Sequence, residues 1–396
     1  MSMIRWLAMA LALVIVACGG GGGVDTGGTG GTVQSFSSGR IAGFGSIVVN
    51  GVHYDEQSAA IVDDEGATHG RDALALGMTV DVEAGPITVD AASGRSSSVA
   101  SRVRFGSEIK GPLESVDSAN SRLHVLGQIV NVDADTVFDG LPNGLASLQA
   151  GQLLEVFAFF DASTGTYNAT RIERKGQLAS YKLRGLISDL DTTAHTFSIG
   201  GAVIGYAGIA PGQLPGLQNG TLARVDLLTV KQAGIWVATR VLTGLPGPME
   251  GVEAEVEGFV SDFASLASFK VRGVPVDASA AVFRRGDASQ VVNGARVEVE
   301  GHIHAGVLVA TEIEVKKRKG SGPGEDKQEF EFDGPIQSVD LAAGAITVLG
   351  VVVHFDSSTE FDHGSAKDLV AGVRVEVRGT LSNGMQLHAT RIEFRS

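Results

Sequence analysis

The strongest constraint on the fold of this chain is a pattern of strand-forming sequence that recurs along it. Gly294–Gly301 reads GARVEVEG and Gly372–Gly379 reads GVRVEVRG, so apolar and charged residues alternate in both. Each is followed by an Ala-Thr-x-Ile-Glu ending or its close variant, which begins at Ala310 and at Ala389 and also occurs at Ala169. Alternation with a period of two is typical of a β-strand that buries one face. Repetition of such strands specifies a fold but no reaction.

Five copies of the pattern can be aligned from the glycines at which they begin. These are Gly39, Gly111, Gly185, Gly258 and Gly334, and the intervals between them are 72, 74, 73 and 76 residues. Solenoid repeats have periods of about 20 to 50 residues, because each unit relies on its neighbours for a core. A longer period allows a small domain with its own core, so we expect separate domains on a string. The predicted boundaries of copies one to five are 39–106, 107–175, 181–243, 252–315 and 330–396, with a charged linker at 316–329.

The strands of one copy indicate a small barrel. In copy four, Val297 and Val299 point to one side, whereas Arg296, Glu298 and Glu300 point to the other. Five short strands in so short a copy leave little room for two packed sheets, and closure into a barrel removes unpaired edges. The sequence therefore predicts an all-β protein with five tandem OB-like, five-stranded β-barrels after a signal peptide and a Gly-rich tether.

The same motifs resemble those of a bacterial family called domain of unknown function 5666. The resemblance is carried by a Gly-x-Ile start, a Val-x-Gly-x-x-Val turn, the Gly-x-x-Val-Glu-Val-x-Gly strand and the Ala-Thr-x-Ile-Glu ending, and it extends from Gly39 to Ser396. Copy three departs most, since it has Ala223 and Val225 in place of the Val-Glu-Val core. The resemblance implies tandem copies on a secreted protein or lipoprotein, and it implies no activity.

The first residues predict a secretion signal. Arg5 is followed by an apolar stretch from Trp6 to Val16, which is shorter than the roughly 20 residues that span a bilayer. The residues before Cys18 resemble the bacterial lipobox, in which the leader, here 1–17, is removed and the cysteine is acylated with palmitate and related chains. Two or more acyl chains hold a protein stably on a membrane. The alternative is an ordinary signal peptide in which Cys18 is only a small buried residue.

The segment after the cysteine is composed like a flexible tether. Residues 18–38 are nearly all Gly, Thr, Ser and Val, a composition that forms no core and would reach on the order of 25 Å from a membrane. Gly19 resembles the residue that permits sorting to the outer membrane. We therefore expect a protein of the bacterial cell envelope, anchored by lipid, on the outer membrane and facing either the periplasm or the cell surface.

Two residue types recur at fixed places in the copies. An aspartate ends the third strand at Asp55, Asp133, Asp277 and Asp356. A metal or acid role is conceivable, but one aspartate in each separate domain cannot converge on a single site, and an aspartate at a strand end normally caps the next turn. The recurring aromatic residues Phe138, Phe283 and Phe361 are expected to fill the core, with Phe283 in a short irregular piece of copy four.

Residues that differ between copies are better candidates for a specific activity. His302 and His304 lie on one face of a strand or at its turn, at a spacing that can chelate a transition metal. No third ligand lies nearby in the sequence, so exposed histidines are the favoured interpretation and metal binding a weak one. We expect no cofactor.

Composition argues against nucleic acid. The net charge is −14 and only 6% of the residues are aromatic, whereas a phosphate backbone requires a basic face and stacking platforms. The sequence also lacks a nucleophile elbow, a phosphate-binding loop, a His-Glu-x-x-His motif and a cysteine pair. Paired carboxylates brought together only in space remain open.

Two functions follow from these observations. The favoured one is a lipid-anchored envelope protein whose barrels bind or scaffold an envelope protein or polysaccharide, without catalysis. The alternative is an envelope hydrolase or a metal-dependent enzyme with its site at a junction between copies, which requires clustered carboxylates or histidines and a pocket at that junction.

Overall fold

The fold is all-β, and the sequence prediction of small closed five-stranded barrels is confirmed. The computed structural model describes residues 33–244, 247–316, 327–382 and 386–395. Within these ranges the only helical elements are short 3-10 turns, and no helix is long and apolar enough to cross a membrane. The predicted signal peptide, Cys18 and most of the tether lie outside the described residues.

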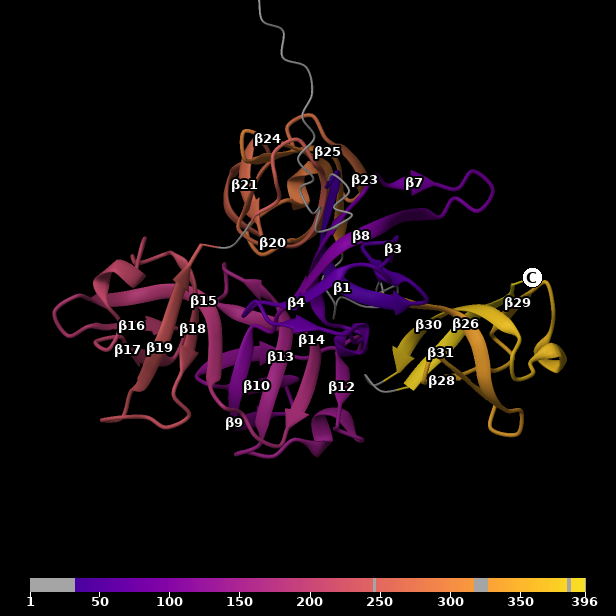
Figure 1. Ribbon diagram of the computed structural model, residues 1–396, viewed down its shortest axis with the longest axis horizontal. Coiled ribbons are helices and arrows are strands. Elements are labelled where there is room, and N and C mark those ends of the chain that lie inside the picture. Colours follow the sequence, from indigo (N-terminus) through magenta and orange to yellow (C-terminus); the bar gives the residue numbers. More distant parts are fainter. Residues whose placement is uncertain (1–32, 245–246, 317–326, 383–385, 396) are drawn as a thin grey trace, which may run out of the picture. The chain divides into compact units, whose positions relative to one another are not determined.

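The strands follow one another in the same order in each copy (Figure 1). Copy one contains β1 (Ser35–Phe44), β2 (Ile47–Val49), β3 (Val52–Asp55), β4 (Ala60–Asp63), β5 (Thr68–His69), β6 (Thr79–Ala84), β7 (Thr88–Val89) and β8 (Ser96–Phe105). Copy two contains β9 (Ile109–Asp117), β10 (Arg122–Val125), β11 (Gln128–Asn131), β12 (Val137–Asp139), β13 (Leu153–Asp161) and β14 (Thr166–Lys175). Copy three contains β15 (Tyr181–Asp191), β16 (Thr196–Ile199), β17 (Ala202–Gly205), β18 (Leu222–Leu227) and β19 (Trp236–Thr243).

The last two copies repeat the arrangement. Copy four contains β20 (Glu253–Ser265), β21 (Ser268–Val271), β22 (Val274–Asp277), β23 (Val282–Arg285), β24 (Arg296–His304) and β25 (Val307–Lys316). Copy five contains β26 (Glu329–Asp340), β27 (Ala345–Val348), β28 (Val351–His354), β29 (Glu360–Asp362), β30 (Arg374–Ser382) and β31 (Gln386–Phe394).

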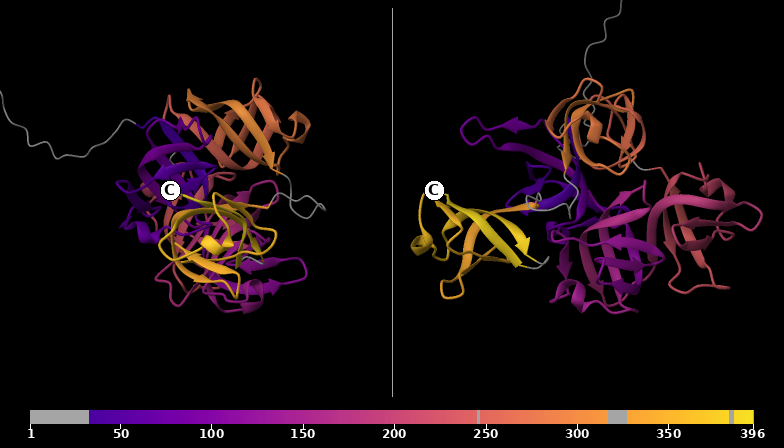
Figure 2. Two further views of the ribbon diagram at one scale, coloured as in Figure 1. Left: turned by 90° about the vertical axis from the view of Figure 1, so that its right-hand side faces the viewer. Right: turned by 180° about the vertical axis from the view of Figure 1, so that it is seen from behind.

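The strand pairings close into a ring. In copy four, β20 pairs with β21, β21 with β22 and β24 with β20, all antiparallel. A parallel pairing between β22 and β25 and an antiparallel one between β25 and β24 complete the circuit. This barrel is seen end-on as a ring in Figure 1 and again in the right-hand view of Figure 2. The equivalent parallel link joins β3 to β8, β11 to β14, β17 to β19 and β28 to β31.

Local sequence explains both the strands and their turns. Val297 and Val299 are fully buried on β24, as their alternation with charged residues predicts. The hairpin between β21 and β22 turns at Arg272 and Gly273, which both have positive φ, 51° and 84°. Positive φ at both central residues is the geometry of a type I′ turn, whose twist matches that of the strands it joins.

A short additional strand lies along the last strand of four copies. The strands β4, β12, β23 and β29 pair in parallel with β8, β14, β25 and β31, and we call them closing strands. Phe283, expected in an irregular piece, therefore lies in a strand, β23, because its segment finds a partner edge on β25. Phe138, Phe283 and Phe361 are only partly buried against the cores.

The copies are joined by strands, contrary to the expectation of separate domains. Ser35–Ser38 of β1 pair in parallel with β20 of copy four, and Gly43 and Phe44 pair in parallel with β26 of copy five. Lys182 and Leu183 of β15 pair with β9. Thr32–Ser396 accordingly forms one compact unit, and the predicted domain boundaries stay a prediction.

The tether is shorter than predicted. Ser35–Ser38, assigned to it because serine is common in linkers, belong to β1. The Ser38 hydroxyl donates to Asp81 at 2.7 Å, and Phe36 is buried in the core of copy four. Pairing on both edges of β1 thus outweighs the weak strand propensity of serine.

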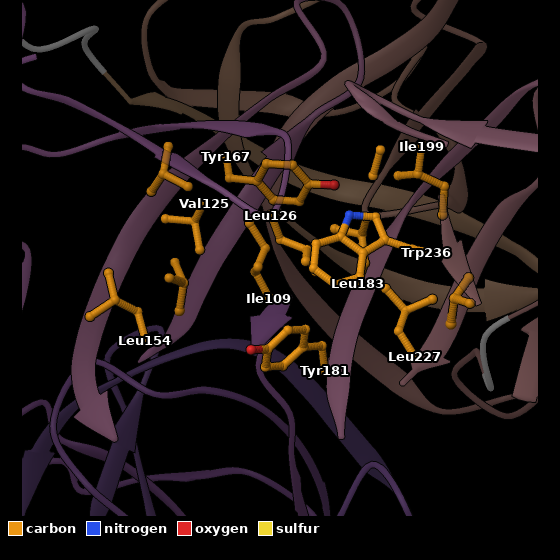
Figure 3. Packing of buried hydrophobic residues seen from close by; sticks show 14 of the residues in the cluster. Ile109, Val125, Leu126, Leu154, Tyr167, Tyr181, Leu183, Ile199, Leu227 and Trp236 are labelled. Atoms are coloured by element: carbon orange, nitrogen blue, oxygen red, sulfur yellow. The ribbon is translucent and has the colours of Figure 1, made fainter. Parts of the chain in front are cut away.

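Copies two and three share one hydrophobic core. Ile109, Val125, Leu126, Leu154 and Tyr167 of copy two pack with residues of copy three in a single buried cluster (Figure 3). The residues from copy three that Figure 3 labels are Tyr181, Leu183, Ile199, Leu227 and Trp236. The remaining copies each centre on a separate cluster.

Candidate functional site

The recurring aspartates lie at turns and do not converge. Asp55 accepts the N–H of Gln57 at 3.0 Å, and Asp133 accepts that of Asp135 at 2.9 Å. In the same way Asp277 accepts from Ser279 at 3.0 Å and Asp356 from Ser358 at 2.7 Å. Hydrogen bonds to the Ser279 hydroxyl and backbone hold the pKa of Asp277 below its ordinary value. Each of these carboxylates therefore caps a turn.

The two candidate metal ligands are exposed on β24. His302 and His304 both lie on the outer face of the strand, on either side of the buried Ile303. His304 Nδ1 lies 3.3 Å from Glu250 Oε1. Glu250 also accepts the backbone N–H groups of Ala305 and Gly306, and these bonds lower its pKa. Within the described ranges, no three His, Cys, Asp or Glu side chains are grouped so as to hold a metal ion.

A shallow depression in copy one is the best candidate for a site, and of its lining residues only Asp55 was singled out from the sequence. It has a volume of about 500 Å³. The β7–β8 hairpin, whose loop extends away from its barrel in Figure 1, contributes Thr88, Arg95 and Ser97 to the lining. The lining residues are Ser46, His53, Asp55, Gly85, Pro86, Thr88, Arg95, Ser97, Ser98 and Val99.

His53 is the central side chain of this depression. It lies on β3 and its imidazole is buried, at 6% exposure. Arg95 Nη2 is 2.7 Å from His53 Nδ1, and Glu331 Oε1 of copy five is 3.2 Å from His53 Nε2. A guanidinium has donors only, so Nδ1 must accept and Nε2 carries the proton that faces Glu331. The two neighbours thus fix both the orientation and the tautomer of the imidazole.

Acidic side chains of copy five surround Arg95. Its guanidinium lies 3.5 Å from Asp333, 3.5 Å from Glu376 and 3.8 Å from Glu331. These acids have further cations, because Arg374 is 2.8 Å from Asp333 and Arg378 is 3.0 Å from Glu376.

The balance of these charges favours the ionised form of Glu376. Burial of Glu376 by itself would raise its pKa, but Arg395, Arg378 and Arg95 outweigh the burial and hold the pKa below its ordinary value. Glu376 is thus stabilised as a carboxylate by arginines of both copies.

The same geometry limits the chemistry that His53 can support. Ser46 Oγ lies 3.4 Å from His53 Nδ1, beyond a good hydrogen bond, and Arg95 occupies that nitrogen at shorter range. A serine is activated only when a free imidazole nitrogen can accept its proton. In this arrangement the hydroxyl groups of Ser97, Ser98 and Thr88, together with Asp55, offer hydrogen bonds to a polar ligand instead.

A second group of charged residues joins copy one to copy three. Lys182 of β15 is almost fully buried, and its Nζ lies 3.0 Å from both carboxylate oxygens of Asp64. Arg224 donates to the Asp64 carbonyl oxygen. Burial lowers the pKa of Lys182, against the opposing attraction of Asp64. These groups pair with one another, and Asp64 also lines a shallow depression with Arg102 and Arg104.

Sequence reasoning missed His53, Arg95 and Glu331 because they belong to different copies. One signal was present in the chain: the connection Gly85–Arg95 between the fourth and fifth barrel strands of copy one is much longer than its counterpart Ala162–Gly165 in copy two. An insertion in one copy marks a place where the repeat has diverged, and it carries both Arg95 and much of the depression.

Comparison with known proteins relates three of the copies to a family. The model of DUF5666, a domain of unknown function, matches residues 110–173, 257–314 and 333–393. Copies two, four and five are therefore similar to the DUF5666 family. Copies one and three close into the same ring of strands without a match. No curated protein matches the chain.

Proposed function

We propose that this protein is a lipid-anchored component of the bacterial cell envelope whose joined barrels bind or scaffold other envelope components without catalysis. The observation that carries the proposal is that the charged groups at the junctions pair with one another. Arg95 faces three acids of copy five and occupies His53 Nδ1. Residues that pair with one another in this way join copies, and their polar atoms are not available for proton transfer.

The partner is an envelope protein or polysaccharide, reached from a membrane to which acylated Cys18 is attached. The net charge of −14 favours solubility beside an anionic surface and disfavours nucleic acid as a partner. Several weakly binding barrels on one chain would gain avidity on a repetitive partner. The DUF5666 repeats supply the tandem sites that such avidity requires.

The test is retention on isolated envelope material. Full-length protein and a series of deletions that remove one copy after another are mixed with envelope fragments, washed and quantified. The proposal predicts a stepwise fall in retention with each deletion. Failure of the full-length chain to be retained would contradict it. A Cys18→Ser variant tests the anchor separately, because it should leave the membrane fraction while it keeps its binding to fragments added in solution.

The alternative of an enzyme at a junction is favoured by one observation, the proximity of Ser46, His53 and Glu331. It predicts turnover of ester or glycoside substrates that is lost in His53→Gln and Glu331→Gln and kept in Arg374→Gln. Arg374 belongs to the same charge network and lies outside the lining of the depression, so it is the matched control. Absence of turnover by the wild-type chain across both substrate classes leaves the scaffold proposal as the better one.

A further inference from the structure

The barrel of copy three lacks the closing strand that the other copies have. The place is taken by residues 206–217, which contain Pro211 and Pro215 and form only a single 3-10 turn, Pro211–Gln213. Proline has no N–H to donate and is disfavoured beside another strand. Copy three therefore closes its ring through β17 and β19 while the rest of the β19 edge stays without a closing strand.

The pairings define how much of this edge is open. β17 pairs with β19 only at Trp236 and Val237. From Ala238 to Thr243, β19 pairs with β18 on its other side, and among the described residues no strand pairs with its outer edge (Figure 1). The replacing connector makes most of its backbone hydrogen bonds within itself, such as Gln213 N to Ala210 O at 2.9 Å, and Tyr206 N donates to His195 O. At the end of β19 the Thr243 hydroxyl donates to the carbonyl oxygen of Pro215 in this connector. Its Ile209, Leu214 and Leu217 cover the core.

Charges in the other copies show what a strand at this edge must carry. In copy two Arg171 of β14 pairs with Asp139 of the closing strand at 2.5 Å. In copy five Arg391 pairs with Asp362 in the same way. Copy four has the charges reversed, because Glu312 takes the place of the arginine and pairs with Arg284 of the closing strand. In copies two, four and five the closing strand thus carries the charge opposite to that of the third residue in the Ala-Thr-x ending, whereas in copy one the equivalent Arg102 pairs with Glu83 of β6.

Copy three has the arginine and lacks its partner strand. Its ending reads Ala238-Thr-Arg-Val-Leu242, so Arg240 corresponds to Arg171 and Arg391. The side chain of Arg240 is 47% exposed, and its nearest carboxylate is that of Asp226, at 4.0 Å. Leu242 stands where copies two and five have a glutamate, and it is also exposed. A carboxylate on a strand of another molecule could pair with Arg240 beside the open edge of β19.

We propose that the outer edge of β19 binds an extended segment of a partner protein, which lies parallel to β19 and carries an apolar residue followed by an acid. In the register of copies two and five, the apolar residue lies opposite Val241 and the acid opposite Leu242, from where it reaches Arg240. Strand addition at an exposed edge obtains affinity from backbone hydrogen bonds and specificity from side chains. The inference rests on the proposed binding function and specifies the partner as a protein.

The probe is a peptide with the sequence of residues 134–141, ADTVFDGL, which contains the closing strand of copy two. Its fluorescein-labelled form is titrated with the full-length chain in detergent, and anisotropy is measured. The aspartate corresponding to Asp139 is replaced by Arg in a second peptide, and the residue corresponding to Phe138 by Pro in a third. We expect binding of the first peptide, weaker binding of the second and loss of binding of the third.

Reversing the charge of Arg240 in the protein gives the decisive comparison. Arg240→Glu should weaken binding of the acidic peptide by roughly three- to tenfold and strengthen binding of the arginine peptide. Arg174→Glu is the matched control, since Arg174 is an exposed arginine on β14, whose edge is already filled; it should change neither affinity. A photoreactive residue at the Phe position should crosslink to β19.

Three binding results would contradict this site: equal binding of the acidic and arginine peptides, no effect of Arg240→Glu, or crosslinks to another copy. Concentration-dependent dimers that dissociate in Arg240→Glu would also contradict it, because the occupant would then be a second copy of this chain. If the peptide fails to bind while deletions still reduce envelope retention stepwise, the edge site is wrong and the binding function stands.

Discussion

Copies two and three are consecutive, have the same ring of strands and share one core, yet they differ along one edge. In copy two, β12 lies on β14 and the family model matches. In copy three a proline-containing connector replaces the closing strand, and β19 is open beyond Val237. The comparison shows that the alternating strands suffice to build the ring, whereas the closing strand depends on a short connector that can diverge without loss of the barrel.

The largest expected effect tests the shared core. Leu183 is fully buried where β15 meets β9, so Leu183→Ala should cost about 2–5 kcal/mol of unfolding free energy. Because the core is common, amide protection should fall in β9 and β13 as well as in copy three. Denaturant unfolding and hydrogen exchange measure both effects, and a loss confined to copy three would separate the two barrels.

The next effect compares equivalent arginines. Arg171 is nearly buried and contacts Glu173, Asp139 and the Leu76 carbonyl oxygen, so Arg171→Gln should cost about 2 kcal/mol by removing charge-assisted hydrogen bonds. Arg240→Gln should change stability by less than about 0.5 kcal/mol, as for other exposed surface sites. Urea midpoints of the two variants test the difference, and similar midpoints would contradict the assignment of an open edge.

An exchange of connectors should convert one barrel into the other. Replacing residues 207–216 by 133–140 supplies copy three with the closing strand of copy two. We expect about 1 kcal/mol of added stability, in the range of common stabilising changes, together with loss of peptide binding at β19. Thermal unfolding and the anisotropy assay report the two results, and retained binding would show that the peptide does not use this edge.

The smallest effect concerns pH. Burial of Glu155 would raise its pKa, but Lys110 and Lys175 outweigh it and hold the pKa below the ordinary value of 4.5. A depressed carboxyl pKa adds stability that is present above the unfolded pKa and is lost as pH falls through the folded one. Glu155→Gln should therefore flatten the loss of stability below about pH 4.5. Urea unfolding at a series of pH values measures this change, and an acid limb equal to that of the wild-type chain would contradict it.

The sequence predicted the fold well because the ring depends on a local signal. Alternation in Gly294–Gly301 and its relatives determines which face of each strand is buried, and this requires no knowledge of other copies. The closing strands were missed, since segments such as Val282–Arg285 are too short to show a period. The joining of copies by β1 was missed as well, because Ser35–Ser38 have a linker composition and become a strand only when β6 and β20 supply partners.

The candidate site was less predictable for a related reason. His53, Arg95 and Glu331 meet only when copies one and five are in contact, and no spacing within one copy encodes that contact. The open edge at Arg240 could have been found by aligning the copies, because the Ala-Thr-Arg ending persists there while the aspartate and aromatic residue of the closing strand are missing.

Hydrogen exchange of the native chain tests most directly the claim that copies two and three differ at one edge. On β14, strands lie on both sides from Arg171 to Glu173, so protection should be continuous over these residues. On β19, protection from Ala238 to Leu242 should alternate, with amides directed toward β18 slow and those directed outward fast. Continuous protection of β19 equal to that of β14 would contradict the account.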